Sequence, residues 1–133
     1  METRKPIIAV VDDDEIFMVI ARKMLAFCAP EWQMMEFVNG ERMLEHLNQF
    51  ITSPEKLPDL ILLDINMPVM DGWMFLDEYA KIKSALSKAN QIYLTSSSID
   101  TKDTERAKQN LLLKDYIVKP LSPEIIKKIV SLN

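Results

Sequence analysis

The stretch IIAVVDDD, residues 7–14, changes from five consecutive apolar residues to three consecutive carboxylates. A second stretch, LILLD at residues 60–64, shows the same change and ends in one carboxylate, Asp64. Apolar runs of this length are typical of parallel strands that are covered on both faces. The two stretches therefore predict central strands of one parallel sheet, and each of these strands ends in acidic residues.

Three further short apolar runs follow, and longer segments with helical spacing of apolar residues separate all five. This alternation indicates βα units and therefore an α/β domain built on a parallel sheet. In such a sheet the carboxyl ends of the strands meet at one edge, which is where ligands bind. The predicted strands are residues 7–11, 34–38, 60–63, 92–94 and 116–118.

Apolar residues spaced three and four apart predict the inward faces of four helices. The remaining helical segment, residues 100–110, has Ala107 as its one apolar residue, so we expect it to be weakly anchored. Ser122 and Pro123 suit the N-cap and the first position of the last helix. The predicted inward faces are Ile16, Val19, Ile20, Met24 and Phe27 in the first helix, Met43, Leu44, Leu47 and Ile51 in the second, Phe75, Tyr79, Ile82 and Leu86 in the third, and Ile125, Ile126, Ile129 and Val130 in the fifth.

The length and composition fit one folded domain. The 133 residues support a single core, so we expect one domain over residues 1–133 with a short tail at residues 1–5. An apolar share of 48% and a charged share of 27% exclude a disordered tail or a membrane protein. The net charge of -4, without a basic block, argues against a nucleic-acid partner. No signal peptide or membrane span precedes the first strand, so we expect a cytoplasmic location and no membrane partner.

Side chains of different chemistry stand where the predicted strands end. Asp12 and Asp13 follow the first strand, and Asp64 follows the third. Thr95 ends the fourth strand and Lys119 ends the fifth. Two carboxylates about 4 Å apart repel by roughly 4 kcal/mol at an effective dielectric constant near 20. A hard divalent cation with a preference for oxygen ligands, such as Mg²⁺, removes this repulsion. The acidic edge therefore predicts a metal site.

Four segments together resemble the receiver domains of response regulators, which accept phosphoryl groups in two-component signal transduction. Each segment alone is weak support, whereas the four in the family's order and spacing are strong support. The resemblance extends over residues 7 to about 130. The segments are the acid pair Asp12 and Asp13, the stretch DINMPVMDG at residues 64–72, the strand end at Thr95 and the stretch YIVKP at residues 116–120.

The resemblance implies a doubly wound, flavodoxin-like fold with five parallel strands in the order 2-1-3-4-5 and five helices. It implies that Asp64 is the phosphoryl acceptor and that Mg²⁺ is the one cofactor. The implied metal ligands are Asp13, Asp64 and the backbone carbonyl of Asn66, with Asp12 acting mostly through water. Asp14, by contrast, is expected to cap the first helix. Gly72 is expected to permit a turn that no side chain would allow.

The resemblance also implies roles for the ends of the fourth and fifth strands. Lys119 contacts the phosphoryl group on one side, and the hydroxyl of Thr95 contacts it on another. Thr95 and Tyr116 form the implied switch: Thr95 moves toward the phosphoryl group and the Tyr116 ring turns inward. The fourth helix, the fifth strand and the fifth helix then form the output surface. A cis peptide bond between Lys119 and Pro120 is implied as well.

A protein of this kind is a signalling switch and not a turnover enzyme, although it promotes its own phosphorylation and dephosphorylation. The implied partners are a histidine kinase or phosphotransfer protein and a downstream protein that binds the output surface. Since no effector domain follows Asn133, output is expected to pass through that partner or through onward phosphotransfer. A fragment of a longer protein would have the same sequence features.

Three other functions are conceivable for a domain of this kind, and the sequence argues against two of them. An aspartate-nucleophile phosphatase would carry its Asp-x-Asp nucleophile on the first strand, whereas Asp64 ends the third. A flavin-binding protein of the same fold would have a Ser-, Thr- or Gly-rich loop after the first strand, where residues 12–15 would instead repel a phosphate. A receiver that is not phosphorylated and serves as an interaction module stays open as the alternative.

Overall fold

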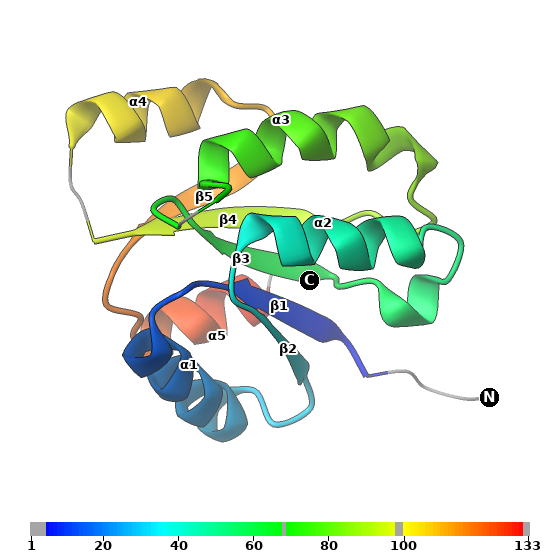
Figure 1. The fold of residues 1–133 in the computed structure, drawn as a ribbon. Helices are drawn as coiled ribbons and strands as arrows, with labels where there is room; N and C mark the ends of the chain where they lie inside the picture. The colour runs from blue at the N-terminus through cyan, green and yellow to red at the C-terminus, as the bar shows by residue number, and fades with distance from the viewer. Residues whose placement is uncertain (1–4, 68, 98–99, 132–133) are drawn as a thin grey trace.

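The computed structural model describes residues 5–67, 69–97 and 100–131. Its centre is a five-stranded parallel sheet in the order β2-β1-β3-β4-β5 (Figure 1). This is the predicted doubly wound order. The strands are β1 (Ile7–Val11), β2 (Gln33–Phe37), β3 (Leu60–Asp64), β4 (Gln91–Ser96) and β5 (Leu113–Val118).

Burial follows the position of each strand in the sheet. Every residue of β1 and of β3 is buried, as the continuous apolar runs predict. The edge strand β5 begins three residues before its predicted start. The prediction missed these residues because Lys114 and Asp115 are exposed and interrupt the apolar pattern. The edge strands thus carry the weaker sequence signal.

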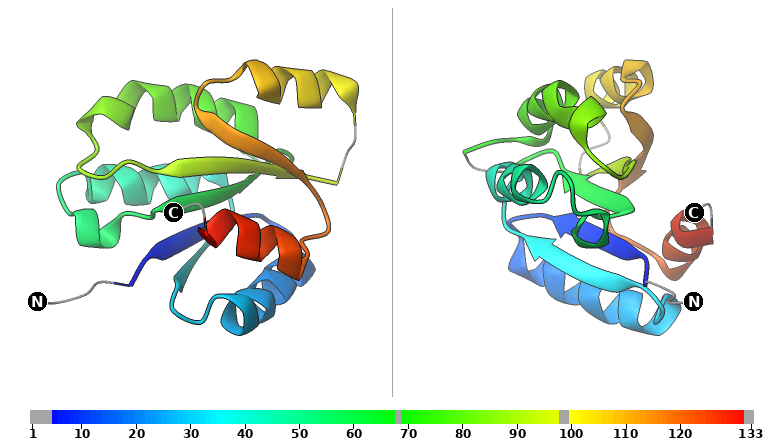
Figure 2. Two further views of the ribbon diagram at one scale, coloured as in Figure 1. Left: turned by 180° about the vertical axis from the view of Figure 1, so that it is seen from behind. Right: turned by 90° about the vertical axis from the view of Figure 1, so that its right-hand side faces the viewer.

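Helices cover both faces of the sheet. Figure 2 shows α1 and α5 on one side and α2, α3 and α4 on the other. Asp14 caps α1, as predicted, and the hydroxyl of Ser122 accepts the N–H of Ile125 at 3.2 Å at the start of α5. The helices are α1 (Glu15–Cys28), α2 (Gly40–Gln49), α3 (Gly72–Ile82), α4 (Thr101–Gln109) and α5 (Pro123–Ser131), with short 3-10 helices at Pro54–Lys56 and Lys83–Ala85.

Two hydrophobic clusters, one on each face, hold the layers together. Phe75 and Tyr79 of α3 stack at 5.9 Å between ring centroids in the larger cluster. Ile126 and Ile129 of α5 pack with α1 in the other. Ala107 is the one buried residue of α4, so this helix is weakly anchored, as predicted. No helix in the described ranges has both the length and the apolar character of a membrane span.

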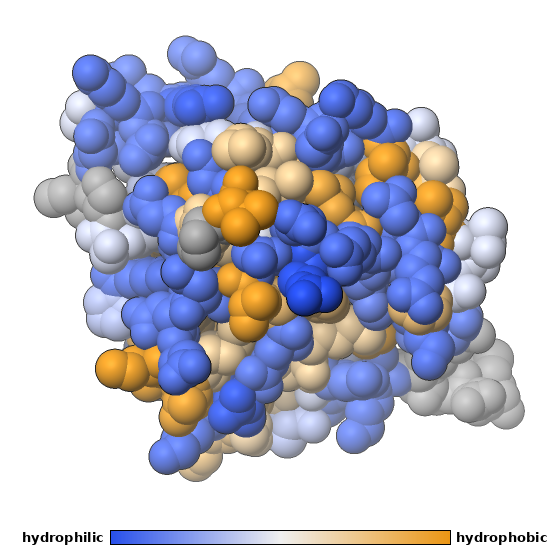
Figure 3. Space-filling model, viewed as in Figure 1, coloured by the Kyte–Doolittle hydropathy of each residue, from blue (hydrophilic) through white to orange (hydrophobic). Residues whose placement is uncertain are grey.

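The predicted inward face of α1 is wrong. Ile16 is 73% exposed and Phe27 is 86% exposed, and Figure 3 shows hydrophobic surface over α1. Val19 and Ile20 are also exposed, whereas Met24 is partly buried. Apolar residues occur almost all round this helix, so their spacing fits more than one face. The residues that are buried are Phe17, Met18, Ala21 and Leu25.

Candidate functional site

The end of β1 places two carboxylates at the edge of the sheet. Asp12 is 2% exposed. Its N–H donates to the carbonyl of Phe37, the last residue of β2, at 3.0 Å. The Oδ1 atom of Asp12 accepts the N–H of Asp14 at 2.9 Å, where the chain turns into α1. Asp13 is exposed. One buried and one exposed acid therefore share this strand end.

The end of β3 brings Asp64 to the same edge. Val11 pairs with Leu63 in the register of β1 and β3, so the residues that follow them, Asp12 and Asp64, lie side by side. Asp64 is 5% exposed. Carboxylate oxygens of Asp12, Asp13 and Asp64 lie within 4.8 Å of one another. The acidic cluster expected from the sequence is thus present, and its ligand atoms are close enough to share a cation.

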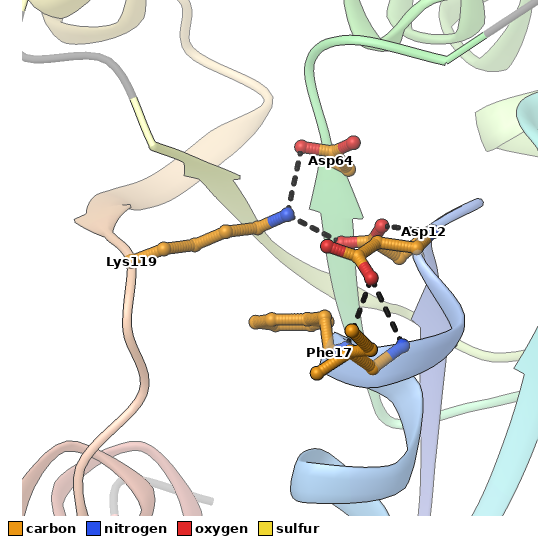
Figure 4. A network of polar contacts seen from close by, with 6 residues as sticks. Asp12, Phe17, Asp64 and Lys119 are labelled. Atoms are coloured by element: carbon orange, nitrogen blue, oxygen red, sulfur yellow. Dashed lines mark hydrogen bonds and ion pairs between the residues drawn. The ribbon is translucent and has the colours of Figure 1, made fainter.

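Lys119 reaches the acidic cluster from the end of β5. Its Nζ atom donates to Oδ2 of Asp12 at 2.7 Å and lies 3.3 Å from Oδ1 of Asp64 (Figure 4). The peptide bond between Lys119 and Pro120 is cis, as the resemblance implied. The ammonium therefore lies between the two buried carboxylates.

The end of β4 holds both neighbouring loops in place. Thr95 is 1% exposed and pairs with Asp64 in the register of β3 and β4. Its carbonyl accepts the N–H of Ile65 at 3.1 Å, and the carbonyl of Ser96 accepts the N–H of Lys119 at 2.8 Å. Two consecutive residues of β4 thereby fix the backbone next to Asp64 and the backbone of Lys119.

Burial and charge perturb both central groups. Burial, together with the charge of Asp12, raises the pKa of Asp64 from 3.8 to about 6, and Lys119 opposes this shift. Burial alone would lower the pKa of Lys119, but the hydrogen bond and charge of Asp12, with Asp64, raise that pKa above its ordinary value. At neutral pH Asp64 is therefore ionised and Lys119 is charged.

Two further predicted site residues are Asn66, which follows β3, and Tyr116, which lies in β5. Asn66 is exposed two residues after Asp64, and the metal contact of its carbonyl stays a prediction. Tyr116 is half-buried in β5 and packs against the hydrophobic cluster on the side of α3 and α4. Its coupling to Thr95 also stays a prediction.

Gly72 is needed at the end of the loop after Asp64 for a different reason from the one expected. None of the described glycines has a positive φ, so Gly72 does not serve an unusual turn. A Cβ at Gly72 would instead lie 2.8 Å from the carbonyl oxygen of Asp64 and 3.0 Å from Cα of Ile65. Gly72 is thus required because the start of α3 packs directly on this backbone. The positive φ in the described part of the loop, 70°, belongs to Val69.

Phe17 belongs to the site but was missed in the sequence. Its ring centroid lies 4.2 Å from Nζ of Lys119, within the range of a cation–π interaction. The predicted inward face of the first helix did not include Phe17, because Ile16 and Val19 fit helical spacing as well as Phe17 does. Its place one turn after the acid pair, at the edge of the sheet, was the available signal.

Comparison with known proteins gives consistent matches. The family model described as "Response regulator receiver domain" matches residues 8–131. The sensor histidine kinase CheAY of Helicobacter pylori is 32% identical over 125 residues, which are 94% of this chain and 14% of that protein. The chain spans 14%, 58% and 50% of the length of three curated relatives that it matches.

Solved structures match over nearly the whole chain. A two-component response regulator from Cytophaga hutchinsonii has a TM-score of 0.85 at 21% identity, with 98% of this chain and 97% of that chain covered. One from Legionella pneumophila has a TM-score of 0.81 at 24% identity, with 96% and 97% covered. At these identities the likeness establishes the fold, which is the predicted flavodoxin-like one.

Proposed function

Because this chain belongs to the response regulator receiver domain family of two-component systems, we propose that Asp64 accepts a phosphoryl group from a histidine kinase or phosphotransfer protein. One observation carries the proposal. The buried carboxylate of Asp64 lies in a cluster with Asp12 and Asp13 and 3.3 Å from the ammonium of Lys119. A nucleophile, metal ligands and a compact positive charge thus meet at one point.

The three side chains fit a hard divalent cation, since all of them offer carboxylate oxygens within 4.8 Å of one another. We assign Asp13 and Asp64 as direct ligands of Mg²⁺, the backbone carbonyl of Asn66 as a third ligand, and Asp12 as a ligand through water. When bound, Mg²⁺ neutralises the charge of the carboxylates and of the phosphoryl oxygens.

In the proposed reaction, an oxygen of Asp64 forms a bond to the phosphorus of a phosphohistidine on the donor protein. The bond between this phosphorus and the histidine nitrogen breaks, and its electron pair stays on the nitrogen. The product is an acyl phosphate on Asp64. The carboxyl group of Asp64 is ionised, as this attack requires, at neutral pH, because its pKa of about 6 lies below pH 7.

Lys119 and Thr95 have supporting roles in this proposal. The ammonium of Lys119 balances the negative charge of the phosphoryl oxygens as a compact point charge. Thr95, the register partner of Asp64, supplies a hydroxyl from β4. The chain is a switch and not a turnover enzyme: it promotes its own phosphorylation and, through attack of water on phosphorus, its own dephosphorylation.

The output surface proposed for this switch is formed by α4, β5 and α5. Grooves of about 320 Å³ and about 580 Å³ border β5, and Tyr116 lines both. Because α4 buries only Ala107, it is held weakly enough to take up two arrangements. A downstream protein partner would distinguish these two arrangements.

Intact-mass measurement after incubation with Mg²⁺ and acetyl phosphate tests the proposal. We expect the wild-type chain to gain the mass of one phosphoryl group and the Asp64→Asn variant to gain none. Asp77→Asn, which removes an exposed carboxylate from α3, is the matched control and should react like the wild type. A wild-type chain that stays unmodified would instead favour an unphosphorylated interaction module.

A further inference from the structure

Phe17 is held rigidly beside Lys119. Its N–H donates to Oδ1 of Asp14 at 3.2 Å, in the cap of α1. Its side chain packs in the hydrophobic cluster between α1 and α5, and the residue is 8% exposed. Figure 4 shows the ring and the carboxylate of Asp64 on opposite sides of the ammonium. Backbone and ring are thus both fixed before any ligand arrives.

Three contacts hold the ammonium of Lys119 at the end of a flexible four-carbon chain. Two join it to carboxylate oxygens, at 2.7 Å to Asp12 and 3.3 Å to Asp64. The third joins it to the ring of Phe17 at 4.2 Å. A cation bound at the acidic cluster competes for the carboxylate oxygens, and phosphorylation changes the charge of Asp64. Of the three contacts, the ring is the one that neither event alters.

We propose that Phe17 is a positioning residue, whose ring keeps the ammonium of Lys119 next to Asp64 once other groups occupy the carboxylates. This inference rests on the proposed phosphoryl transfer to Asp64. A cation over an aromatic face is attracted more strongly where water is scarce. The side chain of Lys119 is only 15% exposed, so the interaction is well shielded. An aliphatic side chain would fill the same space without holding the ammonium.

Nuclear magnetic resonance (NMR) on the metal-free protein tests whether Lys119 lies over the ring of Phe17, independently of phosphorylation. Protons above an aromatic face shift upfield, so the ε-methylene protons of Lys119 report the ring directly. We expect these protons to have upfield chemical shifts in the wild type and in Phe17→Tyr. In Phe17→Leu we expect the chemical shifts of an ordinary lysine. The Lys119→Arg variant assigns the signals by their loss. Ordinary positions in the wild type would overturn the inference.

The rate of phosphorylation by acetyl phosphate with Mg²⁺ tests the role. Phe17→Leu should slow the reaction on the order of threefold to tenfold, while Mg²⁺ affinity stays unchanged. Phe17→Tyr should restore the rate, because it keeps the ring. In a Lys119→Gln background, Phe17→Leu should have no further effect, since the ring acts through the ammonium. Urea unfolding establishes that each variant is folded under the assay conditions.

The outcomes separate this inference from the proposed function. If the wild type is not phosphorylated, the proposed function fails, whatever Phe17 does. If the wild type reacts and Phe17→Leu is equally fast, or Phe17→Tyr is as slow as Phe17→Leu, the positioning role fails and the proposed function stands. An undiminished effect of Phe17→Leu in the Lys119→Gln background also overturns the positioning role.

Discussion

At the scale of single residues, the charged carboxylate of Asp64 carries a cost to stability. Its pKa of about 6 in the folded protein lies above the ordinary 3.8, because burial and Asp12 disfavour the charged form. The contribution of Asp64 to stability is thus fully present below about pH 4 and is lost as the pH rises through 6. Above pH 6 the metal-free protein therefore holds a charged carboxylate in an environment that disfavours the charge.

Replacement of Asp64 by Asn should therefore stabilise the metal-free protein at pH 8. The difference of about two pKa units corresponds to roughly 3 kcal/mol in the free energy of unfolding, and Lys119 keeps its 2.7 Å contact with Asp12. Urea unfolding at pH 4 and pH 8 measures the gain, which should appear at pH 8 only. Equal stability of the wild type and Asp64→Asn at pH 8 would contradict the origin assigned to the raised pKa.

Val69, five residues after Asp64, has a strained backbone. Its φ of 70° is unfavourable for a β-branched side chain, whereas Asn tolerates this region. We expect Val69→Asn to raise the free energy of unfolding by about 1 kcal/mol, as measured by urea unfolding. Val38→Asn is the control, since Val38 is also exposed but does not have a positive φ. A loss of stability in Val69→Asn would show that the valine is not strained.

At the scale of elements, α1 has two apolar faces with different roles. One face carries Leu25, which is 3% exposed, and the other carries Ile20, which is 45% exposed. Leu25→Ala should lower the free energy of unfolding by about 2 to 5 kcal/mol, because it leaves a cavity. Ile20→Ala should change it by less than about 1 kcal/mol. Thermal or urea unfolding measures both changes. Similar losses of stability in the two variants would contradict the assignment of the buried face of α1.

The same helix shows where sequence pattern stops being informative. The strands followed from the apolar runs, and their order followed from the resemblance. The meeting of Asp12, Asp64 and Lys119 followed from the polar ends of the strands, because parallel strands end at one edge. The face of α1 could not be predicted, since its spacing fits several faces. The ring of Phe17 against Lys119 was likewise invisible, because it depends on that face and on a contact between distant parts of the chain.

At the scale of the whole molecule, the sheet joins the site to its surroundings. The acidic cluster is built from the ends of β1 and β3, and β4 fixes the backbone of Ile65 and of Lys119 through two carbonyls. A cation bound to this cluster therefore ties together strands that are far apart in the sequence. It also removes the repulsion that destabilises the metal-free fold.

Mg²⁺ should accordingly stabilise the whole domain. At a concentration about one hundred times the dissociation constant, the expected gain in the free energy of unfolding is about 2.7 kcal/mol. The urea midpoint should rise with Mg²⁺ in the wild type and in Asp77→Asn, but much less in Asp13→Asn. An equal rise in Asp13→Asn would place the cation elsewhere.

Chemical trapping of the phosphorylated residue identifies which side chain accepts the phosphoryl group. After reaction with acetyl phosphate and Mg²⁺, borohydride reduces an acyl phosphate of aspartate to homoserine, which peptide mass spectrometry locates. We expect homoserine at position 64, and none when Mg²⁺ is removed by a chelator. Homoserine at position 12 or 13, or equal labelling without Mg²⁺, would contradict it.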